Sequence, residues 1–229
     1  MLNDVRAVAF DLDNTLWEIE PVLERAEQRL LEWLHVHCPR IPASLSREDM
    51  RAARERLARS EPHNAHDFTY LRLTTLTRHV LEFGYDERLA QQAFEVFFTA
   101  RNEVSPFGDV RGALERLRSR YELATLSNGN ADLTRIGLAD LFRVSLNARQ
   151  VGVGKPHRRC FEELALRLAL EPESIVYVGD DPYLDVDAAR AAGLRTVWMN
   201  RRGELWPAEL AGADLVVNDC DQLAATLGT

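Results

Sequence analysis

The 229-residue sequence predicts an α/β protein with a doubly wound parallel sheet and a helical bundle inserted after the first strand. From residue 105 onward, short apolar segments alternate with helical ones, which is typical of a parallel sheet covered by helices. Another apolar segment, 5–11, precedes a long helical region and finds partner strands only in the C-terminal part of the chain. Polar clusters follow several of these segments, as expected at the carboxyl ends of the strands.

The predicted strands are short, apolar and rich in β-branched and aromatic residues. They are residues 5–11, 121–127, 142–146, 174–180, 195–200 and 214–219. The segments between them have helical periodicity, and these predicted helices are residues 112–120, 131–138, 158–170 and 185–193. Strands that alternate with helices in this way indicate a doubly wound sheet that binds its ligands at the strand ends.

The region from about Glu20 to Val104 is helical in period and dense in Arg and Glu. Ser46 and Asp86 have the character of N-caps, and Gly84 that of a helix stop. The four predicted helices are residues 23–37, 46–60, 67–84 and 86–104, with no strand between them. We therefore expect two domains, a sheet domain of residues 1–17 and 105–229 and an inserted helical domain of residues 18–104.

The composition is that of a soluble globular protein. Its net charge of −8 argues against a nucleic acid or an anionic membrane surface as partner. Cys38, Cys160 and Cys220 lie far apart without a CxxC motif, so we expect free thiols in a reducing compartment. The N-terminal residues lack the character of a signal peptide, and no apolar run approaches the roughly 20 residues of a membrane helix. We expect a cytoplasmic monomer or homodimer.

Four polar clusters end or follow predicted strands. Asp11 and Asp13 in DLDNT are two positions apart, and such close carboxylates repel each other unless a cation such as Mg²⁺ joins them. SNGN (127–130) offers small donors at a strand-to-helix turn, where backbone N–H groups can hold an anion. GVGKP contains Lys155, the only lysine among 28 basic residues, and GDDPYLD (179–185) adds further carboxylates. Together the clusters indicate one site at the edge of the sheet.

The segments DLDNTLW, LSNGN, GVGKP and VGDDPYLDVDAARAAG resemble the four signature motifs of the haloacid dehalogenase superfamily of hydrolases. The resemblance covers the whole predicted sheet, which would be the Rossmann-like catalytic core of that superfamily. The inserted bundle looks like the superfamily's helical cap domain. The resemblance implies a phosphatase whose cofactor is Mg²⁺.

The resemblance also implies roles for individual residues. Asp11 would attack phosphorus as the nucleophile, and Asp13 would protonate the leaving oxygen and then activate water. Mg²⁺ would bind Asp11, the backbone carbonyl of Asp13, and Asp180. Lys155 would neutralise charge beside the phosphoryl group, because a compact ammonium fits where a wider guanidinium does not.

The remaining motif residues would support these groups. The phosphoryl oxygens would be held by three side chains, Thr15, Ser127 and Asn128. Asp181 or Asp185 would support the metal or orient the lysine. Substrate choice would depend on the inserted helices.

The substrate class has alternatives. Superfamily members that cleave carbon–halogen bonds lack the second aspartate, since a halide needs no proton, so Asp13 favours a phosphate monoester over a 2-haloacid. Phosphonate-cleaving relatives use a cap lysine, and this insertion has none. Sugar phosphates, nucleotides and a phosphomutase reaction stay open. Two further readings, a phospho-acceptor signalling domain and a non-catalytic scaffold, are disfavoured by the insertion and by the complete set of catalytic side chains.

The stretch SEPHNAHDFTYLRL (60–73) groups polar residues in the predicted cap, namely His63, His66, Asp67, Tyr70 and Arg72. Together with TLSNGNA and VGDDPYLDV, it resembles bacterial phosphatases acting on flavin mononucleotide and on the ribitylamino-uracil phosphate of riboflavin synthesis. Trp17 could stack on a planar ring. The structural alternatives are that the two histidines cap a helix, that Arg72 lies on a solvated face, and that Trp17 packs in the hinge.

Overall fold

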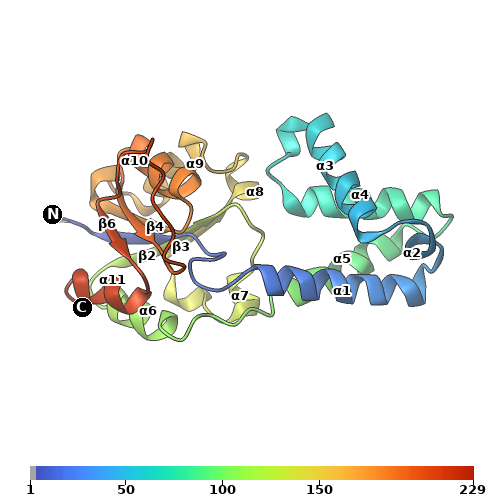
Figure 1. Cartoon of the computed structure of the whole chain (residues 1–229), viewed down its shortest axis with the longest axis horizontal. Helices are drawn as coiled ribbons and strands as arrows, with labels where there is room; N and C mark the ends of the chain where they lie inside the picture. The colour runs from blue at the N-terminus through green and yellow to red at the C-terminus, as the bar shows by residue number, and fades with distance from the viewer. Residues whose placement is uncertain (1–3) are drawn as a thin grey trace. The chain divides into compact units, whose positions relative to one another are not determined.

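The computed structural model describes residues 4–229, which form two compact units. The first unit contains the residues up to Glu18 together with Ser105–Gly129 and Ile136–Thr229. The second contains Ile19–Val104 and Asn130–Arg135. Figure 1 shows the first unit as a sheet with helices and the second as a set of helices. No helix within residues 4–229 is long and apolar enough to cross a membrane.

The first unit is built on a six-stranded parallel sheet with the order β3-β2-β1-β4-β5-β6. This confirms the predicted fold class and all the predicted strands. The strands are β1 (Ala7–Phe10), β2 (Glu122–Ser127), β3 (Val144–Asn147), β4 (Ile175–Gly179), β5 (Arg195–Met199) and β6 (Leu215–Val217). In the register, Val8 of β1 lies opposite Leu123 of β2 and Val176 of β4. The order reverses at β1, so the polar residues that follow β1, β2 and β4 lie at neighbouring positions.

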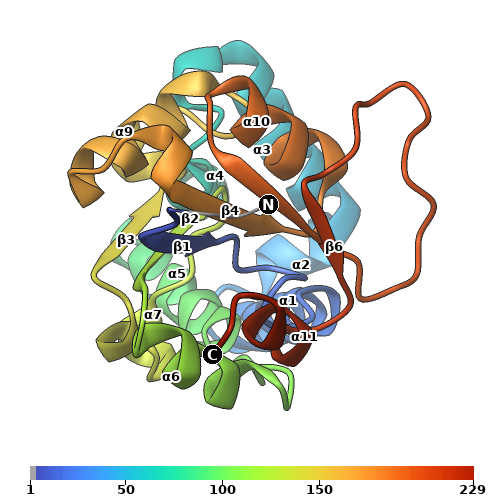
Figure 2. The same ribbon diagram turned by 90° about the vertical axis from the view of Figure 1, so that its left-hand side faces the viewer.

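The central strands are apolar because helices cover both faces of the sheet. Every residue of β1 and β4 is buried, as in the middle of a doubly wound sheet. Figure 2 shows α9 and α10 on one face and α6 and α11 on the other. The helices of this unit are α6 (Val110–Arg118), α8 (Ala148–Val151), α9 (Arg158–Leu168), α10 (Ala188–Ala191) and α11 (Cys220–Thr226). The short helix α7 (Leu133–Ile136) belongs to the second unit except for Ile136. Short 3₁₀ turns lie at Ala139–Leu141 and Pro172–Ser174, and a π-helical segment at Pro182–Asp187.

The second unit packs amphipathic helices around a core that includes Leu30, Leu34, Val80 and Phe94. Its elements are α1 (Glu20–His37), α2 (Arg40–Ser44), α3 (Arg47–Ser60), the 3₁₀ turn η1 (Pro62–Asn64), α4 (Phe68–Glu82) and α5 (Arg88–Arg101). The four predicted helices correspond to α1, α3, α4 and α5. The short helix α2 was not predicted.

The helix ends follow from local chemistry. Ser46 and Asp49 form a capping box at the start of α3, as the prediction of a Ser46 N-cap required. Gly84 has φ +71 directly after α4, a left-handed conformation that a glycine adopts without strain. The prediction of Asp86 as an N-cap is wrong by one position, because α5 begins at Arg88 with Glu87 before it. Asp86 still accepts a hydrogen bond from the Arg88 amide.

The segment Asn130–Arg135 contacts the helical unit, although the sequence prediction placed it with the sheet. Asn130 donates to Thr69 Oγ1 at 3.1 Å, and the Asp132 amide donates to Asn102 Oδ1 at 2.7 Å. These partners lie far away in sequence, so hydrophobic periodicity could not reveal them. The free thiols of Cys38, Cys160 and Cys220 are all buried, in agreement with the expectation of no disulfide.

Candidate active site

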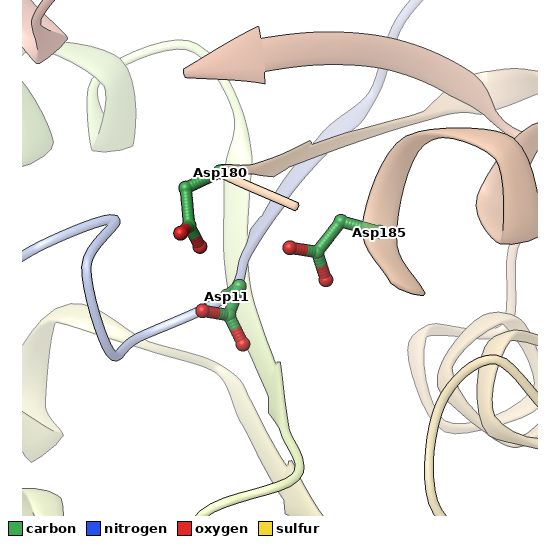
Figure 3. Close-up of side chains that lie close together, drawn as sticks. All are labelled: Asp11, Asp180 and Asp185. Atoms are coloured by element: carbon green, nitrogen blue, oxygen red, sulfur yellow. The ribbon is translucent and has the colours of Figure 1, made fainter. Parts of the chain in front are cut away.

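The candidate site lies where β1 and β4, which are neighbours in the sheet, reach their carboxyl ends. Asp11 follows β1, Asp180 follows β4, and Asp185 lies in the π-helical segment after β4. Figure 3 shows these three carboxylates turned towards one another. One oxygen from each lies within 4.8 Å of the others. Three residues from separate parts of the sequence therefore form one acidic cluster.

Lys155 supplies positive charge to this cluster from the loop after α8. Its Nζ donates to Asp11 Oδ1 at 2.6 Å and to Asp185 Oδ1 at 2.5 Å. A third hydrogen bond, of 2.9 Å, reaches the hydroxyl of Tyr177, which itself donates to the carbonyl of Leu126 at 2.7 Å. The lysine side chain is only 3% exposed, so all three donors of its ammonium are used inside the protein.

The electrostatics of the cluster show an excess of negative charge. Burial alone would lower the pKa of Lys155, but Asp11 and Asp185 reverse that effect and hold it well above its ordinary value. Burial raises the pKa of Asp11 well above its usual range. Lys155 opposes this rise, whereas the nearby charges of Asp185 and Asp180 add to it. Burial and Asp185 also raise the pKa of Asp180, to about 7. With all three carboxylates ionised, the cluster and Lys155 have a formal charge of −2, which a divalent cation would balance.

The donor set fits Mg²⁺, which prefers carboxylate oxygens. Asp185 is already engaged through both oxygens, with Lys155 on one and the Asp181 amide at 3.1 Å on the other. Asp11 and Asp180 are therefore the better metal ligands, as the resemblance implied. Thr15 lies beside both, with its hydroxyl 3.5 Å from Asp11 Oδ2 and 3.3 Å from Asp180 Oδ1. The backbone carbonyl of Asp13 stays an expected ligand.

Asn128 holds the backbone of Lys155, and its expected contact with a phosphoryl oxygen stays a prediction. Its side-chain oxygen accepts from the Lys155 amide at 2.7 Å, and its side-chain nitrogen donates to the Lys155 carbonyl at 2.9 Å. These two bonds fasten the lysine loop to the end of β2. The side-chain nitrogen has two N–H donors, and the Lys155 carbonyl needs only one of them. Ser127 is also buried, and its hydroxyl accepts from the Gly129 amide at 3.0 Å.

Asp181 fixes the backbone of the π-helical segment, and its expected support of the metal stays a prediction. Its side chain accepts hydrogen bonds from the amides of Tyr183 and Leu184, at 2.8 and 2.9 Å, and so caps the π-helical segment. Of the two alternatives for supporting the cluster, Asp185 is the one in contact with Lys155. The side chain of Asp181 fixes the turn that places Asp185.

Trp17 does not offer its ring for stacking. It is fully buried, and its Nε1 donates to Asp13 Oδ1 at 2.8 Å. The idea that it stacks on a planar substrate ring is therefore wrong, and Trp17 instead holds the second aspartate of DLDNT in place. Asn14, between these two residues, has φ +64, a turn conformation that asparagine tolerates better than most residues.

The polar residues predicted in the insertion have different partners: Tyr70 and His63 are linked through Glu61 and Asn64, whereas Arg72 bonds to Glu27. Asp67 caps α4, and the Tyr70 hydroxyl donates to Glu61 at 2.7 Å. His63 lies in η1 and contacts Asn64. Because Asp67 is the cap of α4, neither His63 nor His66 has the capping role considered for it. Arg72 is 9% exposed and pairs with Glu27 at 2.7 Å, so its placement on a solvated face is also wrong.

Sequence reasoning missed three residues that support the site. Tyr177 lies in the middle of an apolar strand, and its buried hydroxyl had to find a polar partner. Trp198 on β5 donates to the Asp180 carbonyl at 2.8 Å. A Cβ placed on Gly179 would lie 2.4 Å from the Asp185 carboxyl group, so only glycine allows this approach.

Comparison with known proteins places this geometry among related enzymes. The chain is 28% identical over 202 residues to the 5-amino-6-(5-phospho-D-ribitylamino)uracil phosphatase YigB of Escherichia coli K12, covering 86% of this chain and 84% of that protein. It is 26% identical over 209 residues to haloacetate dehalogenase H-2 of Moraxella sp. strain B, with 88% of each covered. A crystal structure of a 2-haloacid dehalogenase from Pseudomonas syringae pv. Tomato DC3000 has a TM-score of 0.92 and 35% identity, over 97% of this chain and 98% of that one. Residues 5–193 match the family of haloacid dehalogenase-like hydrolases, and the chain therefore belongs to that family.

Proposed function

We propose that the chain is a Mg²⁺-dependent phosphatase that hydrolyses a small phosphate monoester through a phosphoryl group carried on Asp11. The observation that carries the proposal is the grouping of Asp11, Asp180 and Lys155, combined with a second aspartate, Asp13, two positions after the first. Mg²⁺, when bound by Asp11 and Asp180, supplies positive charge against the negative charge of the phosphoryl oxygens.

The side chains divide the reaction into two displacements. The carboxylate of Asp11 attacks phosphorus, the bond to the ester oxygen breaks, and Asp13 gives that oxygen its proton. Asp13 then takes a proton from water, which attacks the same phosphorus and releases Asp11 and inorganic phosphate. Two anions must meet in the first step, and the ammonium of Lys155, 2.6 Å from Asp11, reduces their repulsion.

The surrounding residues position these groups. The indole of Trp17 holds Asp13 by its hydrogen bond of 2.8 Å. Asn128 holds the backbone of Lys155 by two hydrogen bonds, so the ammonium is fixed at both ends of its side chain. We assign Thr15, Ser127 and Asn128 to the phosphoryl oxygens. Fixed positions of this kind supply much of the rate enhancement in phosphoryl transfer.

A 2-haloacid dehalogenase is the second candidate, and the crystal structure with a TM-score of 0.92 favours it. In that reaction, an aspartate displaces a halide from carbon, and the halide leaves without a proton. Asp13 would then have no chemical task, although Trp17 holds its carboxylate. The excess negative charge of the acidic cluster would also lack an explanation. These two observations favour the phosphatase.

For the substrate, we propose a small phosphorylated metabolite, with flavin mononucleotide or a riboflavin-pathway phosphate as first choice. The support is the likeness to the Escherichia coli phosphatase. The burial of Trp17 removes the ring-stacking argument that favoured a flavin. Sugar phosphates and nucleotides are therefore tested on equal terms.

The decisive test is a turnover screen with and without EDTA. It includes flavin mononucleotide, ribitylamino-uracil phosphate, sugar phosphates, nucleotides and 2-chloropropionate. We expect release of phosphate from at least one ester only with Mg²⁺, and loss of this activity in Asp11→Asn and Asp13→Asn. Halide release that survives in Asp13→Asn, without phosphatase activity in the wild type, would establish the dehalogenase instead.

A further inference from the structure

The helical unit contains a pocket of about 330 Å³, and none of its lining residues belongs to the acidic cluster. It is lined by α1, α3, α4 and α5, the helices of this unit in Figure 1, together with Asn130. Its volume falls at the lower end of the range of small-molecule sites. The lining combines apolar side chains with three arginines, Arg51, Arg54 and Arg72.

Two large apolar side chains of the lining are exposed to solvent. Phe68 is 51% exposed and Leu23 is 39% exposed, although both are large apolar side chains at this pocket. Leu71, Ala58 and Ala65 extend the apolar surface. Exposed apolar side chains that gather around a concave surface are typical of a site for an apolar group.

The charged part of the lining has more cations than its carboxylates can match. Arg54 and Arg72 share a single carboxylate oxygen, Glu27 Oε1, at 3.1 and 2.7 Å. Arg51 pairs with Glu55 at 3.0 Å, so three guanidinium groups face two carboxylates and one positive charge is in excess. Burial and Arg72 lower the pKa of Arg54 to about 10, a further sign of crowded cations.

Arg72 also has hydrogen-bonding capacity left over. It is nine-tenths buried, and its guanidinium lies over the ring of Phe97 at 3.4 Å from the centroid. Within residues 4–229, its Nη1 is buried without a hydrogen-bond partner. An unsatisfied buried guanidinium nitrogen is costly, and an anionic oxygen is the partner that would satisfy it best.

We propose that this pocket binds a small organic anion, with its carboxylate or phosphate at Arg54 and Arg72 and its apolar body against Phe68 and Leu71. The ligand has two possible sources, the organic part of the enzyme's own substrate or a separate effector. Only the first source rests on the proposed phosphatase function. Asn130 of the pocket follows Ser127 by three positions in the sequence, which is why the substrate is included.

The test uses two fluorescent probes that share one apolar body. 1-Anilino-8-naphthalenesulfonate carries an anionic group, whereas N-phenyl-1-naphthylamine is neutral. Binding is measured on the Asp11→Asn variant, so that no catalysis intervenes. We expect Arg72→Met and Arg54→Met each to lower the affinity for the anionic probe at least tenfold. The affinity for the neutral probe should fall less than twofold. Each variant keeps one guanidinium on Glu27, so both are expected to fold.

Two further variants serve as controls. Ala58→Phe fills the pocket without removing an arginine and should weaken the binding of both probes. Arg78 lies on the same helix as Arg72 but outside the lining, so Arg78→Met should weaken the binding of neither probe. Cooperative unfolding of each variant shows that it is folded. The proposal would be overturned if neither probe binds, or if the affinity for the anionic probe is the same in both arginine variants as in the parent.

Competition then separates the two sources. If an ester that proves to be a substrate displaces the anionic probe at concentrations near its KM, the pocket binds the substrate. Retention of the probe at saturating ester assigns it to a separate effector. Both outcomes support an anion pocket, and neither probe titration depends on whether any phosphate ester is turned over. A failure of the proposed function is therefore distinguishable from a failure of this inference.

Discussion

Replacement of Lys155 by methionine should destabilise the sheet unit strongly, and more so at neutral than at acid pH. The substitution keeps the apolar stem but removes the ammonium that lies 2.6 Å from Asp11 and 2.5 Å from Asp185. Loss of one partner from a buried ion pair costs about 3–5 kcal/mol. For a chain of this size, that corresponds to a drop of roughly 6–20 °C in the melting temperature.

The pH dependence follows from the proton affinity of Asp11. Burial already raises its pKa, and loss of Lys155 removes the main opposing influence. A carboxyl group whose pKa is higher in the folded than in the unfolded state loses stability as pH rises through that interval. The deficit relative to the wild type should therefore grow as pH rises past the pKa of Asp11 in the wild type, and should be smaller at acid pH.

The assay is urea unfolding followed by circular dichroism at neutral and at acid pH. Arg116→Met is a matched control, because Arg116 pairs with Asp221 at the surface of the same unit, where an ion pair contributes at most about 1 kcal/mol. In a double-mutant cycle, Lys155→Met combined with Asp185→Asn should be less destabilised than the sum of the two single changes. A loss below about 1 kcal/mol at pH 7, or one independent of pH, would refute the argument.

Three further predictions concern the same cluster. Lys155→Arg should fold but lose most of its turnover, because a guanidinium exceeds the space between Asp11, Asp185 and Tyr177; near-wild-type kcat would contradict this. Gly179→Ala should lose about 1–3 kcal/mol in urea unfolding, since its Cβ would meet the Asp185 carboxyl group at 2.4 Å, whereas Gly108→Ala, with nothing within 4 Å, should change little. Burial and Asp185 raise the pKa of Asp180 to about 7, so protons compete with the metal for this carboxylate. The Mg²⁺ affinity measured by calorimetry should therefore fall about tenfold from pH 8 to pH 6. An affinity that does not change with pH would exclude Asp180 as a ligand.

The sequence predicted the sheet well because its signals are local. Each strand is a short apolar segment, and Asp11 and Asp180 directly follow two of them. Strands that are parallel and adjacent bring their ends together, so the acidic cluster followed from topology and motif order. Ser46 and Gly84 were found for the same reason, since a helix end depends on its own few residues.

The failures of prediction involve partners that are distant in sequence. The bond between the Asn128 side chain and the backbone of Lys155, 27 positions away, was not predicted, because no motif describes it. Arg72 was considered for a solvated helix face, but its side chain bonds to Glu27, which lies 45 positions away in the sequence. Tyr177 gave a usable signal, because a hydroxyl within a fully buried strand must be satisfied by something. Only its partner, Lys155, was unforeseeable.

The central claim is that Asp11 carries the phosphoryl group, and rapid quenching of Asp13→Asn with p-nitrophenyl phosphate and Mg²⁺ tests it most directly. Without the Asp13 carboxylate to activate water, the phosphorylated enzyme should accumulate. Mass spectrometry of the digested protein should then find one added phosphoryl group on the peptide that contains Asp11. Release of p-nitrophenol with no phosphoryl group on that peptide at any quench time would contradict the account.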